Sequence, residues 1–401
     1  MERVYIAAAR RTPIGSFGGA LKSVSVGHLG ATVIKAVLAD TGIAPEAVDE
    51  VILGNVVGTG QGMGPGRQAA LFAGLPNTTP AYSLNMVCGS GMKTVMDAVA
   101  HIRAGEADIV VAAGAENMSQ IPFMAPASLR QGQKMGDISL KDLLVSDGLT
   151  DVFNQYHMGV TAENIANELN ISRERQDAFA LTSQQRAVAA LEANRFADET
   201  TPVEVTERRK TRLFEKDEYP KSDARAEALA GLRPAFAKEG SVTAGNASGL
   251  NDGASAILVV SGKALQQHKL TPLAEIVVTA QTGIEPRIMG LGPVTAVTRA
   301  LEKAGLTLAD MDLLELNEAF AAQALGVAQQ LAEQHGDDLT ALLERTNVNG
   351  GAIALGHPLG ASGNRILVTL LHELKRRGGQ YGVASLCIGG GMGTAVLIRN
   401  C

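Results

Sequence analysis

Two segments of the chain, residues 29–55 and residues 291–317, share one order of apolar and polar positions. In each segment an amphipathic helical pattern ends at a glycine, and a short acidic link then leads into an apolar run of strand length. The glycine is followed after seven residues by an aspartate, Asp49 in the first copy and Asp312 in the second. The pattern therefore predicts two helix–strand units of similar design.

The repeat continues further along each copy. One helical pattern follows Cys88 and leads into an apolar run at residues 109–113, and a second covers residues 366–377 and leads into residues 382–386. We therefore expect Cys88 and His357 to lie at comparable strand-to-helix junctions of two β/α halves. A chance similarity between two ordinary β/α units is the alternative.

Residues 117–248 do not fit the repeat and read as an insertion between the halves. They contain an amphipathic stretch at residues 172–196, with Ser172 as the expected N-cap, and a charge-rich run at residues 208–227. Insertions on a rigid scaffold often build binding surfaces. The predicted domains are residues 1–116, completed by about residues 249–271; an inserted loop domain, residues 117–248; and residues 272–401.

Composition narrows the function classes. With 401 residues, of which 46% are hydrophobic and 19% are charged, the chain is large enough for two or three domain-sized units. The net charge of −6 gives no indication of binding to nucleic acid or a membrane surface. Three cysteines cannot form a disulfide framework, and neither a signal peptide nor a membrane-spanning run is evident. We expect a cytoplasmic protein; a trimmed organellar protein is the alternative.

Two of the three cysteines lie in glycine-rich turns, Cys88 in C-G-S-G and Cys387 in C-I-G-G-G-M-G. A thiol at the start of a helix meets unpaired N–H groups that stabilise its anion. His357, in G-H-P-L-G-A-S-G, is expected at the cap of a helix whose first turn contains Pro358. A histidine there can take a proton from a thiol and then donate a hydrogen bond to an oxyanion. For each residue the alternative is structural: a small buried thiol or a capping histidine.

Cys387 and Asn317 have candidate roles of a different kind. A second thiol is redundant as a nucleophile, but it can act as an acid or base if its pKa is tuned. Asn317 follows a predicted strand at residues 313–316, where its amide can hold a water or a carbonyl oxygen; a turn asparagine is the alternative. No pair of cysteines or histidines has the spacing of metal ligands, so we expect no metal site.

Taken together, these motifs resemble the thiolase family, and within it the acetyl-CoA acetyltransferases. The resemblance spans nearly the whole chain and rests on motifs that occur in order: A-A-R-R-T-P-I-G, C-G-S-G, G-A-E-N-M-S, Y-H-M-G, R-P-A-F, T-A-G-N-A-S-G, N-E-A-F, N-G-G-A-I-A-L-G-H-P-L-G-A-S-G and C-I-G-G-G-M-G. It implies an α/β fold, a duplicated five-layer αβαβα sandwich with an inserted loop domain, and a homotetramer built as a dimer of dimers. The repeat and the insertion agree with that fold.

The resemblance also implies a role for each matching residue. Cys88 is similar to the acyl-accepting nucleophile, His357 to the histidine that activates it, and Cys387 to the base that takes a proton from the substrate α-carbon. Asn317 would hold a water beside His357, and the backbone N–H groups of Cys88 and Gly389 would form a second oxyanion hole. The positions that match contacts to the acyl group or to coenzyme A are His157, Met158, Lys221, Ser248, Ala319 and Phe320.

These roles imply an acetyl-CoA C-acetyltransferase, which joins two acetyl-CoA into acetoacetyl-CoA and free CoA through an acetyl-Cys88 intermediate, with no cofactor beyond these substrates. A broad-range 3-oxoacyl-CoA thiolase of fatty-acid β-oxidation is the alternative, although H-M-G at residues 157–159 favours a short acyl pocket. The second cysteine argues against a decarboxylating ketosynthase, and the full reactive set argues against a non-catalytic carrier. The chain departs from the family pattern at Leu316 and is longer around residues 334–346.

Overall fold

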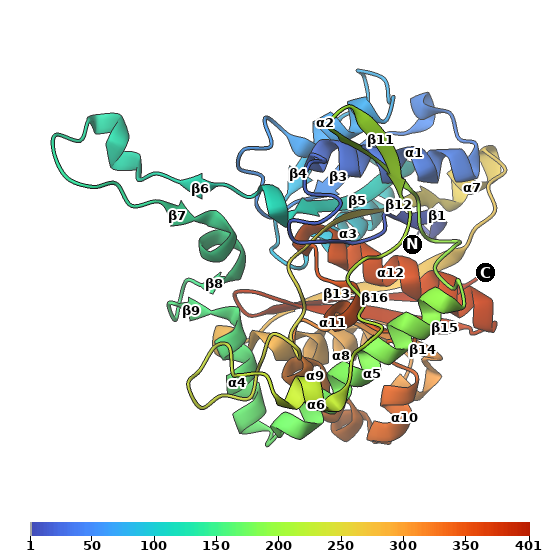
Figure 1. Cartoon of the computed structure of the whole chain (residues 1–401). Coiled ribbons are helices and arrows are strands. Elements are labelled where there is room, and N and C mark those ends of the chain that lie inside the picture. Colours follow the sequence, from blue (N-terminus) through green and yellow to red (C-terminus); the bar gives the residue numbers. More distant parts are fainter. Residues whose placement is uncertain (1) are drawn as a thin grey trace.

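The computed structural model describes residues 2–401 and places a mixed β-sheet at the centre of the molecule (Figure 1). Its strands are β1 (Val4–Arg11), β2 (Gly15–Ser16), β3 (Glu50–Gly54), β4 (Ala81–Leu84), β5 (Ile109–Asn117), β12 (Asn251–Ser261), β13 (Ala274–Gly283), β14 (Leu313–Leu316), β15 (Tyr381–Ile388) and β16 (Met392–Asn400). Hydrogen-bonded neighbours follow the order β14-β15-β16-β13-β1-β12-β5-β3-β4, and β2 pairs with β12.

The sheet consists of two halves with the same pairing scheme. In the N-terminal half β3 runs parallel to β5, β5 pairs antiparallel with β12, and β12 pairs antiparallel with β1. In the C-terminal half β14 runs parallel to β15, β15 pairs antiparallel with β16, and β16 pairs antiparallel with β13. Within the described residues β1 meets β13 only through Tyr5–Glu275 and Ile6–Ala274. The two half-sheets are therefore distinct layers that touch along a short seam.

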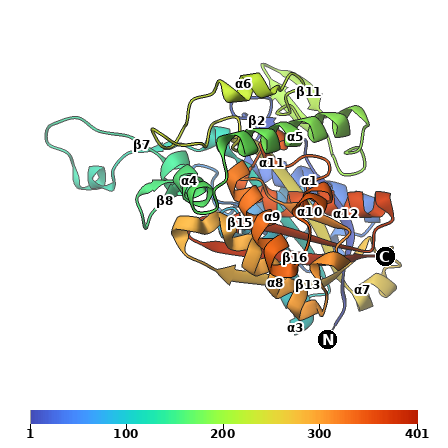
Figure 2. The same ribbon diagram turned by 90° about the horizontal axis from the view of Figure 1, so that it is seen from below.

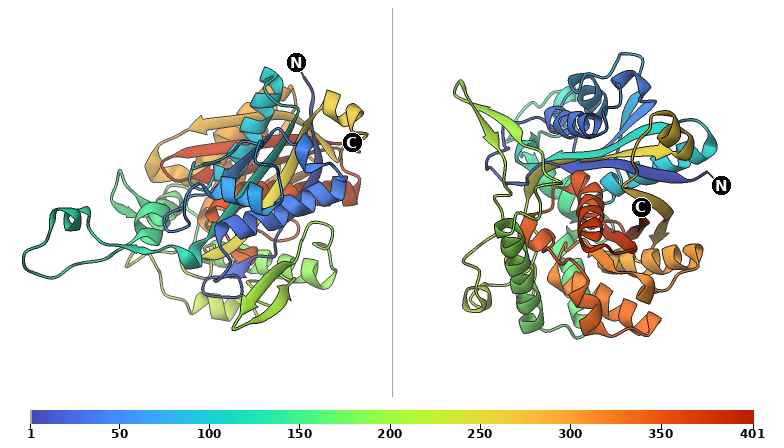
Figure 3. Two further views of the ribbon diagram at one scale, coloured as in Figure 1. Left: turned by 90° about the horizontal axis from the view of Figure 1, so that it is seen from above. Right: turned by 90° about the vertical axis from the view of Figure 1, so that its right-hand side faces the viewer.

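Three layers of helices alternate with the two half-sheets (Figure 3). Their helices are α1 (Val26–Thr41), α2 (Pro65–Phe72), α3 (Ser90–Ala104), α8 (Gly292–Ala304), α9 (Ala321–His335) and α12 (Leu359–Arg377). α1 and α2 pack on the outer face of the N-terminal half, and α8 and α9 pack on that of the C-terminal half. α3 and α12 lie between the half-sheets, where apolar residues of both helices and both halves form one buried cluster. The predicted α/β class and five-layer αβαβα arrangement are confirmed.

The repeat in the sequence corresponds to matching local structure. α1 and α8 both end at a glycine in the left-handed region, Gly42 with φ 64° and Gly305 with φ 67°. Asp49 Oδ2 accepts two backbone N–H groups at the start of β5. Asp312 Oδ2 accepts two backbone N–H groups at the start of β15. Each half thus uses an equivalent aspartate to fix the start of a parallel strand, β5 in the N-terminal half and β15 in the C-terminal half.

The inserted segment packs along one side of the sandwich, where α5 lies beside α6 (Figure 2). It contains β6 (Phe123–Met124), β7 (Lys141–Asp142), β8 (Thr150–Asp151), β9 (Tyr156–His157), α4 (Met158–Glu168), α5 (Arg173–Glu192), β10 (Val203–Glu207), β11 (Lys210–Phe214) and α6 (Ala226–Ala230). Ser172 caps α5 as predicted, but the helix ends at Glu192 rather than at residue 196. The segment from β6 to β7, residues 123–142, is called the arm below and extends away from the rest of the molecule (Figure 1). The domain limits given above stay a prediction.

Shorter helices complete the chain: α7 (Gly262–Gln267), α10 (Leu339–Glu344) and α11 (Ala352–Leu355). The stretch that is longer than the family pattern forms α10, whose end is fixed because Arg186 Nη1 donates to Leu343 O and Thr346 O. Among residues 2–401, no helix combines the length and apolarity needed to cross a membrane. The cytoplasmic location stays a prediction.

Two local predictions around His357 are wrong. Pro358 is the N-cap of α12 rather than a residue of its first turn, because its carbonyl accepts the N–H groups of Ala361 and Ser362. His357 follows the short helix α11 rather than a strand. A left-handed glycine, Gly356 with φ 104°, separates the two helices.

Candidate active site

The turns of Cys88 and Cys387 meet at the centre of the candidate site. Cys88 precedes Gly89, the N-cap of α3, and Cys387 is next to the last residue of β15. The backbone N–H groups of Gly389 and of Cys88 itself favour the thiolate form of Cys88 and so act to lower its pKa. A Cβ on Gly89 would lie 2.3 Å from Ile388 Cδ1, so glycine permits the close approach of the two turns.

Cys387 is buried and Cys88 is half-buried, and loss of solvent favours the protonated form of both thiols. This desolvation raises the pKa of Cys88 to about 11 against the opposing effect of the two N–H donors, and the carboxylate of Glu116 adds to the rise. Burial also raises the pKa of Cys387, and a negative charge on Cys88 would raise it further. Desolvation therefore outweighs the stabilisation of the Cys88 anion that its position at a helix start predicts.

His357 is buried, and its two ring nitrogens face different partners. Nδ1 lies 2.6 Å from Ser362 Oγ, and Ser362 Oγ lies 2.9 Å from Pro358 O. Because a hydroxyl has one proton and Pro358 O can only accept, Ser362 donates to Pro358 O and accepts from Nδ1–H. The neutral imidazole therefore carries its proton on Nδ1 and leaves the Nε2 lone pair free. Burial, together with the charge of Arg365, lowers the pKa of His357 to about 3.

Asn317 lies on the Nε2 side of this imidazole. It follows β14 directly, and its Nδ2 lies 3.5 Å from His357 Nε2. Its backbone N–H donates to Ser385 O on β15, which fixes its position at the strand end. Among the described residues Asn317 Oδ1 has no hydrogen-bond partner, so it can accept a hydrogen bond from a water or a substrate. The structure thus brings Asn317 and His357 together.

A cavity of about 320 Å³ opens beside His357. His157, Ser248 and Phe320 line it together with His357, and most of the remaining wall is apolar. The ring of His157 stacks on Phe236 with 4.6 Å between centroids, which fixes the orientation of the imidazole. Three of the predicted substrate contacts therefore surround one space next to His357.

The remaining predicted contacts are placed differently. Met158 and Ala319 pack in one buried cluster with Cys387, next to the second thiol rather than in the cavity wall. Lys221 is exposed and does not line the cavity; its backbone N–H donates to Gln184 Oε1. The structure does not bring the Lys221 side chain to the site.

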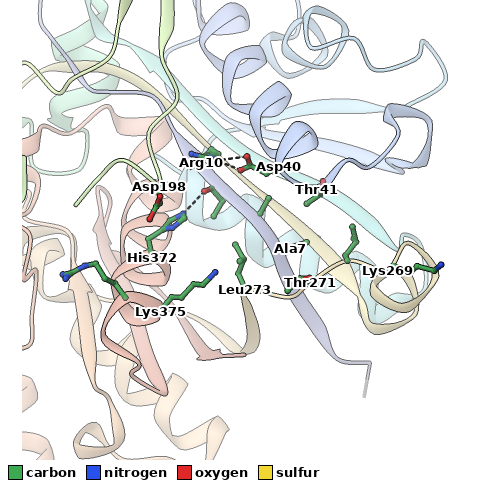
Figure 4. Close-up of a pocket in the computed structure, with 14 residues that line it drawn as sticks. Ala7, Arg10, Asp40, Thr41, Asp198, Lys269, Thr271, Leu273, His372 and Lys375 are labelled. Atoms are coloured by element: carbon green, nitrogen blue, oxygen red, sulfur yellow. Dashed lines mark hydrogen bonds and ion pairs between the residues drawn. The ribbon is translucent and has the colours of Figure 1, made fainter. Parts of the chain in front are cut away.

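A second cavity, of about 700 Å³, lies between the ends of α1 and α12 and the middle of β1 (Figure 4). Arg10 pairs there with Asp40, with 2.6 Å between Arg10 Nε and Asp40 Oδ2, and His372 Nε2 donates to Ala9 O. Its lining includes no cysteine and none of the predicted site residues. Neither there nor elsewhere in residues 2–401 does a group of three His, Cys, Asp or Glu side chains have a geometry that could hold a metal ion.

Sequence reasoning missed two residues that hold His357. Ser362 fixes its tautomer, and Asn251 Oδ1 accepts its backbone N–H at 3.0 Å. Gly356 is required beside them, because a Cβ there would lie 2.4 Å from Asn251 Cγ. Ser362 lies in the glycine-rich motif after His357, so its position in the first helical turn was an available signal. No signal in the sequence pointed to Asn251, because Asn251 and His357 are 106 residues apart in the chain.

Glu116 is a third residue that the sequence did not single out. Its carboxylate accepts the backbone N–H groups of Val56 and Val57 after β3 and that of Gly360 at the start of α12. Burial raises the pKa of Glu116 to about 7 against these hydrogen bonds. One buried carboxyl group thus joins the loop after β3, the strand β5 and the helix that follows His357.

Two family models match the chain: the thiolase N-terminal domain over residues 4–263 and the thiolase C-terminal domain over residues 270–400. The acetyl-CoA acetyltransferase of Chromobacterium violaceum is 58% identical over 398 residues, which cover 99% of each chain. The acetyl-CoA acetyltransferase of Escherichia coli K12 is 52% identical over 400 residues, which cover 100% of each. The chain therefore belongs to the thiolase family, and the resemblance read from its motifs is confirmed.

Solved structures agree with this assignment. The acetyl-CoA acetyltransferase of Bacillus anthracis superposes with a TM-score of 0.95 at 45% identity, covering 100% of this chain and 99% of that one. The human mitochondrial 3-ketoacyl-CoA thiolase superposes with a TM-score of 0.94 at 46% identity, covering 100% of this chain and 99% of that one. The chain is thus an acyltransferase of the thiolase fold throughout its length.

Proposed function

We propose that this thiolase is an acetyl-CoA C-acetyltransferase, which joins two acetyl-CoA into acetoacetyl-CoA and CoA and also runs in reverse. Full-length identity to proteins of that name supports the proposal. The structural observation that carries it is the close approach of the two thiol turns: a Cβ on Gly89, which follows Cys88, would lie 2.3 Å from Ile388 Cδ1, which follows Cys387. The N–H of Gly389 is in the same turn and favours the thiolate form of Cys88. An acetyl group on Cys88 then has its carbonyl oxygen beside this donor and its carbon near Cys387.

In the first half-reaction Cys88 attacks the thioester of acetyl-CoA. Because thiol and imidazole are both neutral at rest, the Cys88 proton passes to His357 Nε2 as the sulfur attacks. The N–H groups of Cys88 and Gly389 stabilise the charge on the thioester oxygen, and one such donor typically contributes about 2.7–4 kcal/mol. Cys387 gives its proton to the departing CoA sulfur. The site then holds acetyl-Cys88, an imidazolium and a Cys387 thiolate.

In the second half-reaction the Cys387 thiolate takes a proton from the α-carbon of a second acetyl-CoA. Its raised pKa makes this thiolate a strong base. His357, with a proton on Nε2, and a water held by Asn317 donate hydrogen bonds to the enolate oxygen. The α-carbon attacks the acetyl group, and the departing Cys88 sulfur takes the proton from His357. Both thiols and the neutral imidazole are restored, and the kinetics should be ping-pong.

Substitution of the two cysteines separates the half-reactions. Cys387→Ala should still become acetylated at Cys88 but should form no acetoacetyl-CoA, whereas Cys88→Ser should form no acetyl-enzyme. Intact-protein mass spectrometry after mixing with acetyl-CoA, followed by peptide mapping, measures both outcomes. Acetylation at another residue, or wild-type condensation by Cys387→Ala, would contradict these assignments.

The alternative function is that of a broad-range 3-oxoacyl-CoA thiolase, which the similarity to the human mitochondrial 3-ketoacyl-CoA thiolase favours. Thiolysis of acetoacetyl-CoA and of a long-chain 3-oxoacyl-CoA, each with free CoA, distinguishes the two. We expect rapid cleavage of the short substrate alone, because His157, stacked on Phe236, narrows the cavity beside His357. Comparable cleavage of both substrates would favour the broad-range enzyme. Cleavage of neither would favour a carrier or ketosynthase.

The proposed enzyme is a homotetramer, a dimer of dimers. The arm supports this, since it leaves large apolar side chains exposed far from the sandwich: Phe123, Met124, Met135, Ile138 and Leu140. Contact with an arm of a second copy would remove these side chains from water.

A further inference from the structure

A buried ion pair connects the helix of His357 to the strand before Asn317. Arg365 Nη1 on α12 lies 3.6 Å from Glu315 Oε2 on β14, and the two side chains are 2% and 3% exposed. Among the described residues, the three guanidinium nitrogens of Arg365 have no hydrogen-bond partner. Moving such a cation out of water is unfavourable, and apolar replacements of buried ion pairs are often neutral or stabilising. Stability therefore does not explain why the pair is present.

The pair joins the same two elements as the contact between His357 and Asn317. Glu315 and Asn317 are two residues apart at the end of β14, so their side chains leave the same face. Arg365 follows Ser362 by three residues on α12, which puts both on one face of the helix, and Ser362 holds His357 Nδ1. The charge of Arg365 acts on the imidazole of His357.

We infer that Arg365 and Glu315 are positioning residues for His357: they hold α12 against β14 at the spacing that brings Nε2 to Asn317, and Arg365 keeps a positive charge beside the imidazole. This inference rests on the proposed proton-carrying role of His357. A neighbouring cation disfavours the imidazolium. A proton taken from Cys88 in the first half-reaction is therefore returned readily to the same sulfur in the second.

Other charged groups reach this region from each element packed around it. Four carboxyl groups, from β14, the turn after it, the inserted segment and β5, act on Arg365 or on Cys88: Glu315, Glu318, Glu199 and Glu116. One further cation, the buried Arg11 on β1, also acts on Arg365. Arg365 is the group whose charge acts on His357. A change of charge at Arg365 should therefore be detected by the imidazole itself.

Replacement of Arg365 by methionine removes this charge and keeps most of the side-chain volume. The pKa of His357, about 3 in the native protein, should rise to between about 4 and 6, below the ordinary histidine value because burial still opposes the charged form. The acid limb of the pH–rate profile for Cys88 acetylation should move to higher pH with this pKa, since protonated His357 cannot accept the thiol proton. Rapid mixing with acetyl-CoA between about pH 4 and pH 8 measures the rate. NMR of the histidine rings, assigned with His357→Asn, measures the pKa.

Three further variants separate the effect of charge from that of folding. Arg365→Lys keeps the cation and should keep the wild-type pH profile. Glu315→Met combined with Arg365→Met removes the whole pair, in which burial raises the pKa of Glu315 to about 8. The double variant should show the same shift of the acid limb to higher pH, and it replaces the single variant if that one does not fold. Arg376→Met breaks the ion pair with Glu373 at the exposed end of the same helix and should leave the profile unchanged.

The outcomes distinguish this inference from the function on which it rests. A folded variant without the Arg365 charge that keeps the wild-type acid limb and the wild-type histidine signal would overturn the inference, even if its thermal stability falls. If His357→Asn acetylates Cys88 at the wild-type rate, the proposed role of His357 fails instead.

Discussion

At the scale of single residues, Ser362 decides which nitrogen of His357 is free to accept a proton. Ser362→Ala removes the acceptor of Nδ1–H, so the imidazole loses the contact that selects its tautomer. A hydrogen bond of this kind contributes about 1 kcal/mol, so Cys88 acetylation should slow about five-fold. The KM for acetyl-CoA should change little, because the hydroxyl does not line the cavity. Single-turnover acetylation followed by quenched-flow mass spectrometry gives both quantities.

Ser255 provides the matched control for this substitution. Its buried hydroxyl donates to Ala361 O at 2.8 Å, in the same first turn of α12, without touching His357. Ser255→Ala should lower thermal stability by a similar amount and leave the acetylation rate unchanged. If both variants acetylate Cys88 equally slowly, the effect comes from the position of the helix rather than from the imidazole tautomer.

At the scale of elements, the sequence predicted the parts whose signals are local. β14 begins and ends at the predicted residues, and α5 begins at its predicted cap because Ser172 Oγ accepts the N–H of Arg175 one turn later. The duplicated helix and strand were visible because Asp49 and Asp312 recur at one spacing from a glycine. Each aspartate accepts a backbone N–H at the start of a strand of its own half, β5 for Asp49 and β15 for Asp312. Such signals lie within one turn or one strand of the element that they define.

The elements and contacts that were missed depend on residues far apart in the chain. Pro358 suits both the cap and the first turn of a helix. The choice is made by the packing of α12, and Glu116, 244 residues away, accepts the N–H of Gly360 in its first turn. The residue pattern alone did not decide whether Cys88 and Cys387 are reactive or structural thiols. The family resemblance supplied their proposed roles. The burial that raises the pKa of both thiols has no counterpart in a local motif.

At the scale of the whole molecule, the arm presents several large apolar side chains to solvent. Phe123 is 64% exposed, Met135 93%, Ile138 49% and Leu140 60%. The arm is closed by the two residue pairs of β6 and β7, and so short a strand pair contributes little stability of its own. Its apolar surface therefore favours association with another copy, which is the physical basis of the proposed tetramer.

Phe123→Ser combined with Ile138→Ser should convert the tetramer into dimers without unfolding the chain. Burial of one large apolar side chain contributes about 1.5–3 kcal/mol, and in a symmetric contact each substitution acts in every subunit. Light scattering coupled to size exclusion should report the mass of two 41.6-kDa chains for the variant and of four for the wild type. Leu213→Ser, at a 54% exposed leucine on β11 outside the arm, should remain a tetramer. A double variant that elutes as a tetramer, or a wild type that is itself a dimer, would show that the arm does not join the dimers. Because Cys88, His357 and Cys387 come from one chain, the dimeric variant should still acetylate Cys88.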